Sequence, residues 1–218
     1  MSITTLKNCR LIMPGVFTFI IILFVLQDDF IGLNNTISIL HDITTQDILL
    51  SIAVLVAGSL YYILGIRDLL WNQYHKRVKD NIKERLLAPF IDGFNDYQQY
   101  IIKSGNQLMN IFYNFIDNDK SLSEKANIVR FNGLICTSSV DATIITAFGA
   151  FIFLIRFIID KGGYAIYMCL ILVALSLFCR YLVELTTRKH IALSNEQLDV
   201  IIQLHQVDLG EKIRAINI

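Results

Sequence analysis

Hydrophobic residues gather in four long runs along the chain, and polar segments separate these runs. The runs cover residues 11–26, 48–66, 134–159 and 164–185. The core of a bilayer is about 30 Å thick, and a helix needs about 20 mostly apolar residues to cross it. Pro14 lies in the first turn of the first run, where a missing N–H costs little. The pattern therefore predicts four membrane-spanning helices, of which the first is the shortest.

The segment between the second and third runs, residues 67–131, is polar but keeps a helical pattern. We expect the helix of the second run to continue past Arg67 as far as Pro89, because no turn signal interrupts it before that proline. After Gly93, apolar residues recur at helical spacing, which predicts one helix with a buried seam. The members of this seam are Phe94, Tyr97, Ile101, Leu108, Ile111 and Phe115, widened by Phe112 and Ile116.

A new helix is expected to begin at Ser121. Residues 117–120 form a turn signal, and Ser121 with Glu124 fits a capping box. This helix should continue unbroken into the third run, and the Lys-Gly-Gly sequence at 161–163 predicts a tight turn before the fourth. The tail carries a second helical seam, formed by Leu198, Ile202, His205, Leu209 and Ile213. We expect the insert to form an antiparallel hairpin whose seam packs on the helix after Ser121 or on the tail.

The predicted fold is an all-α integral membrane protein, with four transmembrane helices in two hairpins and helices extended into a cytoplasmic stalk. The first hairpin covers residues 1–66 and the second covers residues 132–185. A helical hairpin insert, residues 67–131, lies between them, and a C-terminal helix covers residues 186–218.

Basic residues indicate which ends of the spans face the cytoplasm. Of the 19 Lys and Arg residues, the connectors between spans one and two and between spans three and four hold only Lys161. The N-terminus, the insert and the tail carry nearly all the others. Because cytoplasmic loops are enriched in Lys and Arg, we expect both termini and the insert to lie in the cytoplasm. A bacterial inner membrane is the expected location.

Composition adds little beyond this layout. The chain is 54% hydrophobic and only 17% charged, with a net charge of zero, so bulk charge does not point to nucleic acid. The four cysteines are Cys9, Cys136, Cys169 and Cys179. None forms a C-x-x-C pair, and their spacing does not suit a metal site, so we expect buried, reduced thiols.

Small and polar residues form a stripe along the third span. Its members are Ser138, Ala142, Thr146 and Gly149. Small residues let helices approach closely in lipid, and a stripe of this kind repeated around an oligomer could also line a pore. Both alternatives stay open at this point. We expect a homo-oligomer of three to five copies with the third span nearest its axis.

Four charged residues lie in or near the spans: Asp141, Arg156, Asp160 and Arg180. An ionisable residue inside a membrane is costly and is often functional. Asp141 falls near the cytoplasmic boundary, where solvation or pairing with a basic residue is expected in preference to a proton relay. Arg156 and Asp160 form an i,i+4 pair, and Arg180 can extend toward the interface.

Lys76, Lys79 and Lys83 lie on one face of a helix just after the second run. Such a face suits contact with anionic headgroups or with a partner protein. Nucleic acid is an unlikely partner, because no aromatic residues alternate with these lysines. The sequence carries no phosphate loop, no HExxH motif and no Ser/His/Asp arrangement, so we expect neither an enzyme nor a cofactor or metal site.

The order of the four spans and the helical insert resembles small four-span membrane components of bacterial anti-phage systems, such as the membrane subunit of the Kiwa system. This resemblance implies an oligomer that senses or perturbs the membrane together with a cytoplasmic protein partner. We therefore expect a non-catalytic membrane sensor or anchor. A pore-forming or depolarising effector and a bacteriocin-immunity-like protein are the alternatives.

Overall fold

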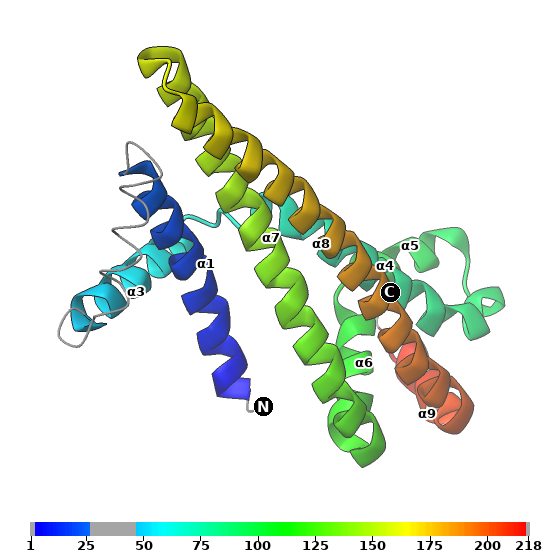
Figure 1. The fold of residues 1–218 in the computed structure, drawn as a ribbon. Helices are drawn as coiled ribbons and strands as arrows, with labels where there is room; N and C mark the ends of the chain where they lie inside the picture. The colour runs from blue at the N-terminus through cyan, green and yellow to red at the C-terminus, as the bar shows by residue number, and fades with distance from the viewer. Residues whose placement is uncertain (1–2, 27–46, 217–218) are drawn as a thin grey trace. The chain divides into compact units, whose positions relative to one another are not determined.

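The computed structural model describes residues 3–26 and 47–216, and these residues form helices without any strand (Figure 1). The polar connector expected at residues 28–47 lies almost entirely outside the described residues. Two compact units make up the chain. Unit 1 holds residues 1–71 and 134–184, and unit 2 holds residues 72–133 and 185–218.

Unit 1 contains the helices that are apolar enough to cross a membrane. Three helices pass this criterion alone: α1 (Ile3–Val25), α7 (Lys120–Asp160) and α8 (Gly163–Leu204). Helix α3 (Asp47–Ile63) passes it only together with the next helix, α4 (Asp68–Leu87), as one broken span. The described residues therefore contain three or four candidate spans, in agreement with the all-helical membrane fold predicted from the sequence.

Helices α1 and α3 touch backbone to backbone at two glycines. A Cβ atom added to Gly15 would collide with the carbonyl oxygen of Val54, and one added to Gly58 would collide with that of Leu11. In lipid, helices gain little from burying apolar side chains against each other, so close backbone approach is a main source of their contact. Gly15 and Gly58 thus allow α1 and α3 to pack closely against each other.

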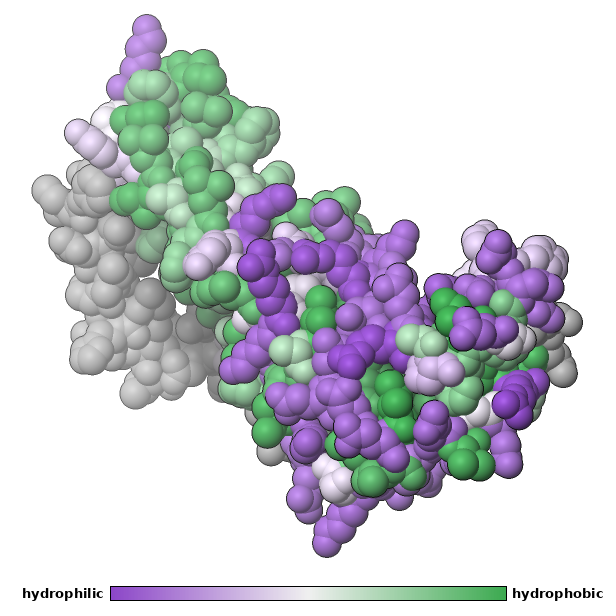
Figure 2. All heavy atoms as spheres, turned by 90° about the vertical axis from the view of Figure 1, so that its right-hand side faces the viewer, coloured by the Kyte–Doolittle hydropathy of each residue, from purple (hydrophilic) through white to green (hydrophobic). Residues whose placement is uncertain are grey.

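Helices α7 and α8 run antiparallel through unit 1 and are joined by a short turn at Lys161, whose φ of 51° is left-handed (Figure 1). The hydroxyl of Ser176 on α8 donates to the carbonyl of Thr143 on α7 at 3.1 Å. The unbroken helix from the insert into the third span is confirmed, and so is the turn at 161–163. Near this turn the surface of the two helices is mostly hydrophobic (Figure 2), as expected for lipid-facing side chains.

The expected continuous helix across the second span is wrong. The chain leaves α3 at Ile63, and α4 begins at Asp68. Gly65 adopts a φ of 62° between them, a left-handed conformation that glycine takes without steric cost. A glycine in a helical apolar run is often tolerated inside the helix, and for this reason it gave no turn signal in the sequence.

Unit 2 has a hydrophobic core of its own. Helix α4 contributes residues such as Ile82 and Leu86, α7 contributes Leu122 and Ala126, and α8 contributes Leu198 and Ile201. The short helix α9 (Gln206–Arg214) adds Leu209 and Ile213, and both are fully buried. The insert therefore packs on the helix after Ser121 and on the tail as well.

The prediction of one helix with one buried seam in the insert is correct for α6 (Gln107–Asn118) and wrong for α5 (Asp96–Ser104). A 3₁₀ turn at Ala88–Gly93 leads to α5 and α6, so two helices replace the expected one. Because the chain breaks at Gly105, the buried face changes phase. Ile102 is buried in α5 and Tyr97 is exposed, whereas Leu108, Phe112, Phe115 and Ile116 are buried in α6 as the seam predicted.

The start of α7 also differs from the expected capping box. The carboxylate of Asp119 accepts hydrogen bonds from the backbone N–H groups of Ser121 at 2.8 Å and Leu122 at 3.1 Å. Asp119 is thus the cap, and the helix starts at Lys120 rather than Ser121. A capping box does occur at α5, where Asn95 and Gln98 each bond the other's backbone N–H.

Candidate functional site

A bidentate ion pair in unit 1 joins Arg67, in the break between α3 and α4, to Asp141 of α7. Arg67 Nε donates to Oδ1 of Asp141 at 2.8 Å, and Nη2 donates to Oδ2 at 2.7 Å. This bidentate pairing is the strongest geometry for an arginine with a carboxylate. Asp141 is 1% exposed. Of the two alternatives expected for Asp141, solvation or pairing with a basic residue, the structure shows the pairing.

Arg67 also reaches the first helix. Its Nη2 donates to the backbone carbonyl of Arg10 in α1 at 2.8 Å. One guanidinium therefore connects α1, the break after α3, and α7. The left-handed Gly65 turns the chain so that Arg67 can reach both partners. Because a buried charge without a partner is costly, this cluster fixes the three segments relative to one another.

Two further polar groups lie in the same cluster. The Tyr61 hydroxyl and the Arg10 Nε are buried beside the Arg67–Asp141 pair, and the Tyr61 hydroxyl is near enough to Asp141 to interact with its carboxylate. Both side chains lie within electrostatic range of the Arg67–Asp141 pair. Buried polar groups are normally bonded, so we group Tyr61 and Arg10 with the Arg67–Asp141 pair in one polar cluster.

The small and polar stripe of α7 is largely covered inside unit 1. Ala142, Thr146 and Gly149 are buried and Ser138 is partly exposed. A Cβ atom on Gly149 would lie 2.9 Å from Ile21 of α1 and 3.2 Å from Leu172 of α8. The Thr146 hydroxyl donates to the Ala142 carbonyl at 2.6 Å, within its own helix. At Gly149, this stripe packs against α1 and α8 of its own chain.

The other charged residues of the spans lie apart from this cluster. Arg156 and Asp160 form the expected i,i+4 pair, with 3.6 Å between Nε and Oδ2. Arg156 Nη1 also donates to the Val25 carbonyl at the end of α1 at 2.7 Å. Arg180 is exposed on α8.

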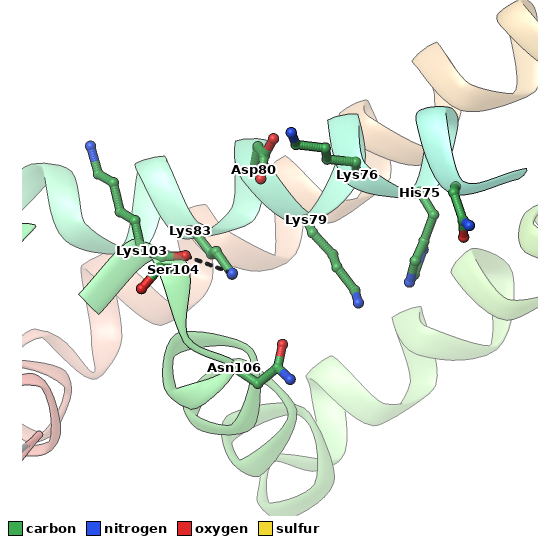
Figure 3. Close-up of a pocket in the computed structure, with 9 residues that line it drawn as sticks. His75, Lys76, Lys79, Asp80, Lys83, Lys103, Ser104 and Asn106 are labelled. Carbon is green, nitrogen blue, oxygen red and sulfur yellow. Dashed lines mark hydrogen bonds between the residues drawn. The ribbon is translucent and has the colours of Figure 1, made fainter. Parts of the chain in front are cut away.

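Lys76, Lys79 and Lys83 line a cavity of about 370 Å³ in unit 2. Lys103 and Ser104, at the end of α5, and Asn106, at the start of α6, line the same cavity. Figure 3 shows the side chains of Lys79 and Lys83 extending from α4 toward Asn106. The three predicted lysines and Lys103 of α5 thus line one cavity, but only Lys79 and Lys83 extend toward Asn106, while Lys76 and Lys103 extend away from it. We call this cavity the basic pocket.

Lys83 is the most buried of these lysines, with only 8% of its surface exposed. Its ammonium donates to the Lys103 carbonyl at 2.7 Å. Asp80 is the single acidic residue that lines the basic pocket. The pocket therefore has a strongly positive character.

Asp119 forms a second polar cluster in unit 2. Hydrogen bonds from the Ser121 hydroxyl and the Leu122 N–H, together with His205, lower the pKa of Asp119 to about 2. His205 Nε2 lies 3.2 Å from Oδ2 of Asp119, and its ring stacks at 5.3 Å from that of Phe115. This cluster links the start of α7 to the break between α8 and α9.

Cysteines and other metal-binding side chains were the remaining candidates for a site. The four cysteines are free, and Cys136, Cys169 and Cys179 are buried. Among the described residues, no group of three His, Cys, Asp or Glu side chains is arranged to hold a metal ion.

The sequence did not predict the roles of Arg67, Lys103 and Asn106. Arg67 looked like one of many basic residues after a span, because the break that aims it at Asp141 was not recognised. Lys103 and Asn106 line the same cavity as the α4 lysines because α5 ends at Ser104 and the chain turns at Gly105. Gly105 followed by Asn106 was the signal in the sequence that could have predicted the end of one helix and the start of the next. No protein-family model, curated protein or solved structure matches this chain.

Proposed function

We propose that the protein is a non-catalytic membrane sensor or anchor, in which unit 1 sits in the bilayer and unit 2 meets a cytoplasmic partner. The observation that carries this proposal is the division into two units with separate hydrophobic cores. Both α7 and α8 supply residues to both units without a break. A change in the packing of one unit can therefore reach the other through continuous helices.

The proposed topology has four spans in two hairpins, with both termini in a bacterial cytoplasm. The distribution of basic residues supports it, because Lys161 alone occupies the two outer connectors. Reporter fusions at residues 35 and 118 test the arrangement. We expect them to report opposite sides of the membrane, and the same side for both would overturn the topology.

The packing of one chain supports the anchor over the pore. A pore lined by the α7 stripe needs polar groups that face an open axis. Ala142 and Thr146 are instead buried, and the Thr143 and Thr146 hydroxyls bond backbone carbonyls of their own helix at 2.7 Å and 2.6 Å. Hydroxyls bonded in this way offer little to a passing ion.

Membrane potential distinguishes the two functions. The protein is expressed alone in bacteria, and a potential-sensitive dye is followed after induction. An anchor that waits for its partner leaves the potential unchanged, while rapid depolarisation would favour the effector. Plaque counts after phage infection, with and without the neighbouring genes, test the anti-phage role that the layout suggests.

A further inference from the structure

The basic pocket gathers cations that carboxylates do not neutralise. Within the described part of the chain, none of Lys76, Lys79, Lys83 and Lys103 forms a salt bridge. Other cations of unit 2 do have such partners, as in Arg85 with Asp199 at 2.6 Å and Lys212 with Asp208 at 2.9 Å. The lysines of the pocket are thus left with positive charge to offer a ligand.

Lys83 makes the strongest case for a ligand. A lysine that is 8% exposed loses most of its hydration, and such a charge is costly unless something compensates it. Its ammonium carries three donors, and the structure gives it one bond, to the Lys103 carbonyl. A position like this costs stability in the free protein, and an anion in the pocket would offset that cost.

The start of α6 adds a second source of positive potential. Asn106 precedes the helix, its side chain makes no capping bond, and no acidic residue lies in the first turn. The N-terminus of a helix of this length favours anions through its free N–H groups and its dipole. Lys79 and Lys83 extend toward this helix start from the opposite side (Figure 3).

We propose that the basic pocket binds an anion with two or more clustered phosphate groups. The cavity, about 370 Å³, lies within the size range of small-molecule sites, which is about 300–1,000 Å³. The ammonium groups of Lys79 and Lys83 both face the start of α6, and two cations beside a helix N-terminus match an anion with several negative charges better than one with a single charge. A soluble polyphosphate or nucleotide and a lipid headgroup share this chemistry. The inference goes beyond the proposed function, and it does not depend on which side of the membrane unit 2 faces.

Binding is tested on the full chain in nanodiscs of phosphatidylcholine, with inorganic tripolyphosphate as the probe and titration calorimetry as the readout. We expect wild type to bind, and to bind more weakly as salt is raised. Lys79→Gln and Lys83→Met should each weaken binding about tenfold or more, because each removes a charge-assisted hydrogen bond. Lys125→Gln is the matched control, since Lys125 is an exposed lysine of the same unit outside the pocket, and it should bind within about twofold of wild type.

The thermal stability of Lys83→Met without any ligand separates binding from folding. If the Lys83 charge is held for a ligand, the variant unfolds at the same temperature as wild type or higher, because replacing a buried charge by an apolar chain is often neutral or stabilising. Loss of stability together with loss of binding would mean that Lys83 is structural. In that case Lys79→Gln tests whether the pocket binds the anion, because Lys79 is only half-buried and its replacement should not affect folding. Unchanged binding in that variant overturns the proposal.

A second lipid composition identifies the source of the phosphates. Nanodiscs that contain cardiolipin, a lipid with two phosphates, are compared with phosphatidylcholine alone. If the pocket takes lipid headgroups, cardiolipin suppresses tripolyphosphate binding to wild type. If it takes a soluble anion, binding is unchanged. Both results support the site, whereas absence of tripolyphosphate binding in phosphatidylcholine, or equal binding by wild type and the two lysine variants, overturns it.

Discussion

A carboxylate buried among apolar helices needs a cationic partner, and Asp141 has one in Arg67. The two hydrogen bonds between these side chains are 2.8 Å and 2.7 Å long. The pair does not need to add net stability to matter. Removing one partner leaves the other charge buried and uncompensated, which is far more costly than removing both.

Variants of this pair test that asymmetry. Asp141→Asn alone and Arg67→Met alone should each lower the free energy of unfolding by about 3–5 kcal/mol, the usual effect of breaking a buried ion pair. The double variant should recover a large part of that loss, because no buried charge is left alone. Denaturant unfolding of the full chain in detergent measures all four proteins. Additive losses in the double variant would show that the two residues do not depend on each other.

Asp119 makes stability depend on pH. Its pKa is about 2 in the folded chain and about 3.8 ordinarily, because its hydrogen bonds favour the ionised form. The ionised cap therefore contributes stability above about pH 4, and this contribution is lost as the pH falls toward 2. We expect the unfolding temperature of wild type to drop across this interval and that of Asp119→Asn to be lower at pH 6 and to drop less.

Asp117→Asn is the control for this measurement. Asp117 is exposed at the end of α6 and close to Asp119 in sequence. It should keep the wild-type dependence on pH. A flat profile for wild type between pH 4 and pH 2 would contradict the role of Asp119 as the cap.

At the scale of elements, the long helices could be predicted and their breaks could not. Hydrophobic runs and the Lys-Gly-Gly turn were enough to place α7 and α8. Breaks at Gly65 and Gly105 were missed, because a glycine within a helical pattern can either stay in the helix or end it. Tertiary contacts decide between these outcomes: at Gly65 the turn lets Arg67 reach Asp141, a residue far away in sequence.

The contact of α1 with α3 depends on two glycines, Gly15 and Gly58. Gly58→Ala and Gly15→Ala should both lower the unfolding temperature of the protein, because a methyl group at either site collides with a carbonyl of the facing helix. Gly162→Ala is the control, since its Cβ would meet no atom within 4 Å. Equal stability of all three variants would show that α1 and α3 do not approach this closely in the membrane.

For the whole molecule, the question is whether the α7 stripe faces another copy or its own chain. The sequence predicted an oligomer built on Ser138, Ala142, Thr146 and Gly149, because small residues let helices approach closely in lipid. In the structure Ala142, Thr146 and Gly149 are buried, and Gly149 packs against α1 and α8. An oligomer stays a prediction, but it needs a different surface of the chain.

Gly149→Leu distinguishes the two arrangements. Its side chain would have to displace Ile21 and Leu172, whose atoms would lie 2.9 Å and 3.2 Å from the new Cβ. We expect the variant to lose thermal stability and to keep the particle mass of wild type in mild detergent, as measured by light scattering. Phe148→Leu, on an exposed position beside it, should change neither. If Gly149→Leu instead unfolds like wild type but forms a smaller particle, the stripe lies between copies. The four-residue packing face would then belong to the assembly, and the contacts of α7 with α1 and α8 would be too loose to exclude a larger side chain.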